Sequence, residues 1–136
     1  MRVEVLSRIW ITDKRHNRCK VKDAVYVHKY TDPIVAMSSS PHRQLEEMIS
    51  FLFRMVHFIR EHCYKHFKSV VFIDPNIHES HHAYLILICY LQYYGRVPWK
   101  MAYQQLKTIT APFSLSHLSL VVLDAFYRRH CITREK

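Results

Sequence analysis

The chain has 136 residues, of which 49% are hydrophobic, and a formal net charge of +9 at neutral pH. This is enough material for one compact domain with a buried core. Because no apolar run approaches the ~20 residues that span a bilayer, the composition excludes a membrane-spanning protein. The positive charge favours acidic partners, namely nucleic acid, phosphorylated protein or an acidic protein surface.

The four cysteines indicate a reducing compartment. They are scattered through the chain without the paired spacing of a metal or redox motif, and two of them lie in apolar, helix-like segments. Their positions are Cys19, Cys63, Cys89 and Cys131. The first five residues lack the apolar stretch of a signal peptide. We therefore expect a cytosolic or nuclear protein with free thiols.

The first half of the chain predicts two strands and a long helix. The segments "RIWIT" (8–12) and "AVYVHKY" (24–30) alternate and are rich in β-branched and aromatic residues, which is typical of strands. Ser40 is a good N-cap and Pro41 suits the first helical position. Apolar residues then recur at helical spacing and predict one buried stripe. The stripe consists of Leu45, Met48, Ile49, Leu52, Val56, Ile59 and Cys63.

The second half predicts a buried strand followed by helices. Residues 69–73 form a short apolar run, and the next helix, 80–94, is apolar almost all round, as expected at the centre of a fold. Gly95 is expected to close that helix as C-terminal glycines do. Pro98 starts another helix, and "LSLVVLDAFYRRH" (118–130) forms the last. This order predicts a single α/β domain, 1–136, with a central sheet flanked by helices and an all-helical C-terminal half.

Four segments carry a family resemblance. They are "RIWIT", Ser40-Pro41, "YYGRVPWKMAYQQL" (93–106) and "LSLVVLDAFYRR" (118–129), in this order. Together they resemble the non-catalytic N-terminal domain of the mitotic-exit dual-specificity protein phosphatases, along nearly the whole chain. The loop around Pro112 looks shorter than in that family. The resemblance implies a protein tyrosine phosphatase-like fold, a degenerate phosphate loop and a cell-cycle setting.

The loop after the buried strand lacks the groups that phosphatase chemistry requires. A working loop needs a cysteine thiolate at the end of the strand and, six positions later, an arginine that grips the phosphate. Asp74 and Ser80 stand at or beside these positions, and Pro75 removes a backbone N–H group. The whole loop is Asp74, Pro75, Asn76, Ile77, His78, Glu79 and Ser80. We therefore predict no catalytic residue and no enzyme, with Asp74 capping the next helix instead.

Other motifs give weaker signals. His62-Cys63 resembles the His-Cys pair of phosphatases, but Ser69 stands where the arginine should follow. The pairs His62/His66 and His78/His82 have a spacing that can share a metal, yet zinc needs three or four ligands, so we predict no metal and no cofactor. Ser40 is followed by Pro-His-Arg, which fits a proline-directed phosphorylation site as well as a helix cap.

These patterns predict a protein-interaction module, acting as an adaptor or regulatory subunit. Its partner would be an acidic or phosphorylated protein, or a second copy of the chain. The expected interaction surface comprises Trp99, Tyr103, Arg128 and Arg129. Two alternatives stay open: nucleic-acid binding through the basic surface with its aromatic residues, and phosphopeptide binding at the degenerate loop 74–80.

Overall fold

The computed structural model describes residues 2–12, 23–27, 41–73, 82–109 and 115–132. Within these ranges four strands form one mixed sheet in the order β1-β2-β4-β3. The strands are β1 (Arg2–Leu6), β2 (Ile9–Thr12), β3 (Ala24–Val27) and β4 (Ser69–Ile73). Strands β2 and β3 both run parallel to β4, which makes β4 an interior strand. Its last four residues are all buried, as a strand covered on both faces requires.

Strand β1 is an addition to the predicted elements. It pairs antiparallel with β2 through a tight turn at Ser7 and Arg8, and the register shifts between Glu4 and Leu6. Arg8 has a left-handed backbone, with φ 66°. The Arg8 carbonyl accepts a hydrogen bond from the Val70 N–H at 2.8 Å, which joins this turn to the start of β4.

The described residues contain the four predicted helices. They are α2 (Pro41–Arg60), α4 (His82–Tyr93), α5 (Trp99–Ile109) and α6 (His117–Phe126). Two of them continue as π-helical turns, α2 into η1 (Glu61–Lys65) and α6 into η2 (Tyr127–Cys131). At the start of α6 the Ser116 hydroxyl accepts the Ser119 N–H at 3.1 Å, a standard N-cap. None of these helices combines the length and apolar character that a bilayer crossing requires.

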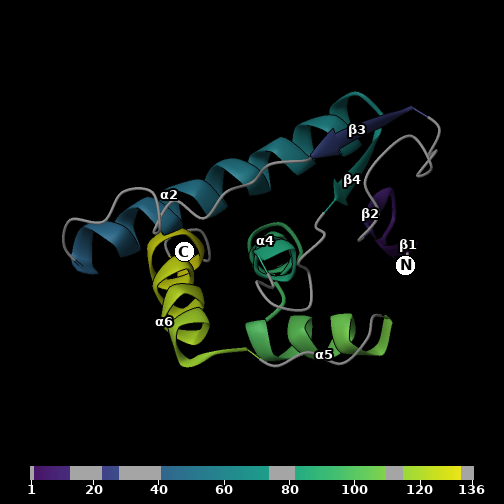
Figure 1. Ribbon diagram of the computed structural model, residues 1–136. Helices are drawn as coiled ribbons and strands as arrows, with labels where there is room; N and C mark the ends of the chain where they lie inside the picture. Colours follow the sequence, from purple (N-terminus) through teal and green to yellow (C-terminus); the bar gives the residue numbers. More distant parts are fainter. Residues whose placement is uncertain (1, 13–22, 28–40, 74–81, 110–114, 133–136) are drawn as a thin grey trace.

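Helix α4 lies at the centre of the molecule, with α2, α5 and α6 around it and the sheet on the remaining side (Figure 1). Its residues from Ala83 to Cys89 are all buried, which confirms the prediction of a central helix. Five residues of the predicted stripe on α2 are buried against it: Met48, Ile49, Leu52, Val56 and Ile59. Each buried side chain of this size contributes about 1.5–3 kcal/mol, so α4 and its neighbours hold the fold together.

The end of α4 corrects the prediction for Gly95. Gly95 does not adopt a left-handed backbone; the next residue, Arg96, does, with φ 54°. A Cβ atom at Gly95 would lie 2.7 Å from the Leu91 carbonyl oxygen, so only glycine lets the chain pass this close to that carbonyl. The Val97 N–H then donates to the same carbonyl at 3.2 Å. This turn sets Arg96 at the exposed end of the central helix.

Candidate functional site

The carboxyl end of β4 is the position where open α/β sheets bind ligands. Strand β4 ends at the buried residue Ile73, and α4 becomes fully buried at Ala83. The predicted degenerate loop, Asp74–Ser80, lies between them and outside the described residues, as does the predicted phosphorylation site Ser40. Only the strand and the helix that flank the loop are therefore described.

Cys63 lies in η1, near the amino end of β4. Its thiol donates a long hydrogen bond to the Arg8 carbonyl at 3.7 Å, and Arg8 Nη1 donates to the Cys63 carbonyl at 3.3 Å. Burial raises the pKa of the Cys63 thiol and outweighs the opposing effects of Arg8 and the Val70 N–H. A nucleophilic cysteine requires a lowered pKa, so this environment disfavours the reactive thiolate.

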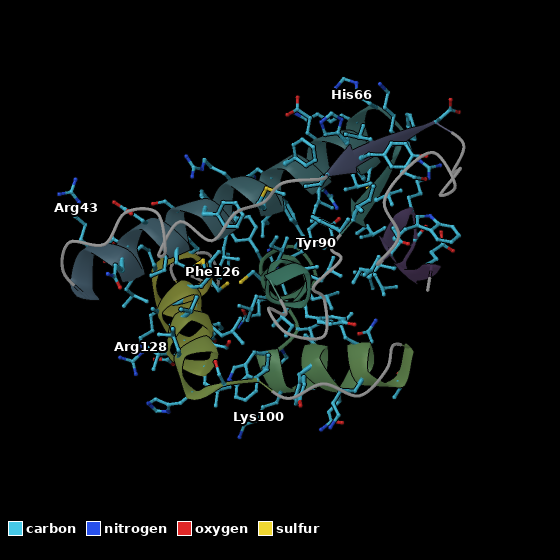
Figure 2. The ribbon with its side chains drawn as sticks, in the orientation of Figure 1. Arg43, His66, Tyr90, Lys100, Phe126 and Arg128 are labelled. Carbon is cyan, nitrogen blue, oxygen red and sulfur yellow. The ribbon has the colours of Figure 1, made fainter. Side chains whose placement is uncertain are left out.

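Around Cys63 the described residues form a shallow hollow of about 340 Å³. Two aromatic side chains at its edge are unusually exposed, Tyr64 at 63% and Phe67 at 70%. The Arg60 guanidinium lies 3.9 Å from the centre of the Tyr64 ring, and that of Arg8 lies 5.3 Å from the Phe67 ring. We call Arg8, Arg60, Tyr64 and Phe67 the Tyr64–Phe67 surface. Figure 2 shows His66 at this end of α2 and Arg43 at the opposite end.

Phe67 and Arg8 share an unfavourable backbone conformation. Their φ angles are 55° and 66°, in the left-handed region that costs an L-residue about 1–2 kcal/mol. The turn that holds Phe67 is closed by the Lys68 N–H, which donates to the His62 carbonyl at 2.9 Å. Residues held in such conformations cluster at functional sites, so the strain draws attention to this surface.

A second hollow, of about 270 Å³, lies where α4 ends and α5 begins. We call it the Gln92 pocket; it is lined by Gln92, Arg96, Val97, Pro98, Trp99, Asp124 and Tyr127. Gln92 is only 4% exposed. Neither the oxygen nor the nitrogen of its carboxamide has a hydrogen-bond partner among the described residues. Buried polar atoms in native proteins are nearly always paired, so this amide requires an explanation.

The four predicted interaction residues lie on α5 and η2 and make different contacts. Trp99 is part of the wall of the Gln92 pocket, and Arg128 pairs with Asp124 of the same pocket at 3.1 Å. Tyr103 packs against the core and contacts Lys107 instead. Arg129 binds the Glu46 carboxylate through both of its terminal nitrogens, with Nη2 2.6 Å from Oε1. Arg129 thus joins the end of α6 to the start of α2.

Gln92, Tyr64 and Phe67, which characterise the two hollows, were missed in the sequence, although some signals were present. Gln92 is a polar side chain within an otherwise apolar helix, which is a pattern that marks a special position. Tyr64 falls outside the apolar stripe of α2. Phe67 continues the spacing of that stripe and is exposed because the helix ends before it.

The His62 and His66 rings lie 6.0 Å apart, centre to centre. Within the described ranges no group of three or more His, Cys, Asp or Glu side chains is arranged to hold a metal ion. His78, one member of the other predicted pair, lies outside these ranges.

A scan of the chain against protein-family models finds no match, and a search of curated proteins finds none either. Any assignment of function therefore depends on the residues and geometry of the chain itself.

Proposed function

We propose that this chain is a catalytically inactive phosphatase-like module that works by binding another protein, as an adaptor or regulatory subunit. The resemblance of the sequence to the phosphatase family is supported by the order of elements around β4. An interior parallel strand is followed, after a segment (74–81) that is polar in sequence, by a buried central helix. This is the strand–loop–helix order in which a helix N-terminus can receive a phosphate group.

The lack of activity is supported first by the loop sequence, since Asp74 and Ser80 replace the nucleophile and the phosphate clamp. A carboxylate beside a phosphate dianion would repel it by roughly 1–4 kcal/mol per unit charge. The thiols of Cys63 and Cys89 offer no substitute. Burial raises the pKa of Cys63, and it raises that of the fully buried Cys89 well above the usual value.

The observation that carries protein binding is the Tyr64–Phe67 surface. Tyrosine and arginine are among the residue types that contribute most binding energy at protein interfaces, and here the exposed Tyr64 stacks on the half-buried Arg60. A guanidinium stacked on a ring keeps its N–H donors at the edge, where they can bind carboxylate or phosphate oxygens. Lys65 and Lys68 are exposed in the same segment. The proposed partner is therefore an acidic or phosphorylated protein.

The same combination of aromatic rings and positive charge supports nucleic-acid binding as a second candidate. Base stacking needs an open ring face, and the arginines leave only one face of Tyr64 and one face of Phe67 for a base, whereas both guanidinium groups can still bind acidic oxygens. We therefore favour the protein partner, and the purification below separates the two candidates.

An aryl phosphate assay tests the inactivity. We expect purified wild-type protein to hydrolyse the aryl phosphate no faster than the Cys63→Ser variant does. Hydrolysis by the wild type that is lost in Cys63→Ser would show that the chain is an enzyme.

Quantitative affinity purification from the native organism, with nuclease treatment and mass spectrometry, tests the binding surface. We compare wild type with an Arg60→Glu/Tyr64→Ala variant and with an Arg54→Glu/Met101→Ala control, which changes the charge equally at exposed positions elsewhere. An acidic protein should be retained by wild type and control and lost from the first variant. Equal retention by both variants would contradict the proposed surface, and nuclease-sensitive retention would favour nucleic acid.

A further inference from the structure

The Gln92 pocket contains a polar group that the described part of the fold does not use. Gln92 is more than nine-tenths buried, and its carboxamide lacks both a donor and an acceptor among the described residues. Burial without hydrogen bonds is unfavourable, so a ligand that supplies both partners gains from satisfying them. Because both amide atoms are shielded from solvent, binding must turn the carboxamide toward the pocket.

A primary carboxamide presents one acceptor and one donor group side by side. Its natural complement is a group that offers a donor and an acceptor at similar spacing. In an extended peptide the N–H and C=O of a single residue meet this condition, since antiparallel strands exchange both bonds between two opposed residues. The Gln92 side chain can thus take the place of one residue of a neighbouring strand.

The walls of the pocket favour a peptide with an apolar side chain. Val97, Pro98, Trp99 and Tyr127 supply apolar and aromatic surface around Gln92. The volume of about 270 Å³ lies just below the usual range for small-molecule sites, roughly 300–1,000 Å³, and suits one inserted side chain. Aromatic-lined grooves of this kind are common in peptide recognition.

The charges at the pocket edge determine which type of residue is favoured next to the apolar residue of the peptide. Arg96 is exposed and part of the lining, and Lys100 lies 5.8 Å from the Trp99 ring. The one acidic lining residue, Asp124, is paired with Arg128. The pocket edge is therefore positive overall, which favours an acidic peptide residue. Figure 2 shows Lys100 and Arg128 on the side of the molecule away from His66, so this site is separate from the Tyr64–Phe67 surface.

We propose that the Gln92 pocket binds an extended peptide segment of a partner protein. The N–H and C=O of one peptide residue pair with the Gln92 carboxamide, an apolar side chain packs against Trp99, and an acidic residue lies near Arg96. This inference deepens the proposed protein-binding function but places it at a second site. Its tests therefore do not depend on Arg60 or Tyr64.

The first test screens the wild-type protein with a positional-scanning library of nine-residue peptides, acetylated and amidated at their ends. We expect selection for an apolar residue next to Asp or Glu. In the best peptide, N-methylation of one backbone nitrogen should weaken binding by about tenfold or more, since it removes the paired donor. Selection of no peptide, or equal tolerance of N-methylation at every position, would overturn the inference without affecting the Tyr64–Phe67 surface.

The second test uses variants with the same peptide. Gln92→Leu preserves the side-chain size and should lose about tenfold or more in affinity, whereas Tyr64→Ala should bind as wild type does. Arg96→Gly suits a left-handed backbone, so it should fold and lose only the preference for the acidic residue.

Nitrogen-15 NMR gives a separate readout, because the Gln92 side-chain amide resonances should shift when the peptide is added. Unchanged peptide binding by Gln92→Leu would overturn the proposal. So would shifts of these resonances on addition of AMP but not of peptide, because they would indicate a nucleotide site.

Discussion

Helix α2 continues into a π-helical turn with exposed side chains, whereas the last turn of helix α4 contains a buried polar side chain, Gln92. Beyond α2 the rings of Tyr64 and Phe67 are 63% and 70% exposed, whereas Gln92 near the end of α4 is 4% exposed. Both ends nevertheless carry a residue with a left-handed backbone, Phe67 after η1 and Arg96 after α4. The difference teaches where binding groups can be changed freely. At the end of α2 they lie on the surface, whereas Gln92 near the end of α4 is part of the packed interior.

The largest expected effect tests this contrast directly. Leu87 is completely buried in α4, so Leu87→Ala should lower the free energy of unfolding by about 2–5 kcal/mol. Tyr64→Ala, in the turn beyond α2, removes mainly a contact with Arg60 and should lower the free energy of unfolding by less than about 1 kcal/mol. Denaturant unfolding of both variants measures these values. Similar losses in the two variants would mean that the end of α2 is as tightly integrated as α4.

A substitution at Gly95 should have the next largest effect. Replacing glycine by alanine in an ordinary helix is stabilising. At Gly95 the added methyl group would lie 2.7 Å from the Leu91 carbonyl, and we expect Gly95→Ala to destabilise the protein by about 1–3 kcal/mol. Gln104→Ala, at an exposed position on α5, is the control and should change stability little. A stabilised Gly95→Ala would show that the turn before the Gln92 pocket is not constrained by this contact.

The sequence could predict most of the fold because periodicity reports burial. The apolar stripe of α2 and the apolar run of α4 identified the helices that form the core. Strand β1 was missed because its pairing with β2 depends on a turn at Arg8, where a left-handed backbone is adopted without a glycine. The same reason explains the error at Gly95, where the left-handed residue is the following arginine.

The candidate sites were harder to predict, because they depend on where helices end and on contacts between distant segments. The exposure of Phe67 results from the end of η1, which the spacing of the stripe does not reveal. Arg128 and Arg129 are adjacent in sequence but bind different acidic residues, Asp124 and Glu46. Glu46 lies 83 positions away in the chain, so no local pattern connects it with Arg129.

The stability of the protein should also depend on pH, through the contact between His130 of η2 and Phe53 of α2. His130 stacks on Phe53, and its pKa is lowered by burial and by the nearby Arg129 and His57. The unfolded chain therefore takes up this proton first, at about pH 6.5. Stability should be greatest above that pH and fall as the pH drops toward the lower pKa of the folded state. Unfolding followed from pH 7.5 to pH 5 should show a weaker decline in His130→Phe, and an identical decline would exclude His130 as the cause.

The smallest effect concerns the backbone that the two helix ends share. Phe67→Gly removes the cost of about 1–2 kcal/mol that an L-residue has in a left-handed conformation. It also destabilises the protein by about 0.5–1 kcal/mol, because glycine has more backbone entropy in the unfolded chain. Because the ring is mostly exposed, the variant should be as stable as wild type or up to about 1 kcal/mol more stable.

Phe67→Ala loses the same ring but keeps the strain, so it should be less stable than Phe67→Gly by a similar amount. Arg96→Gly should behave as Phe67→Gly does, because the φ angles of the two positions are 54° and 55°. If Phe67→Gly proved less stable than Phe67→Ala, the backbone at this position would favour an L-residue and would not be strained. If both variants were destabilised by several kcal/mol, the ring would be packed, and the Tyr64–Phe67 surface would belong to the interior as Gln92 does.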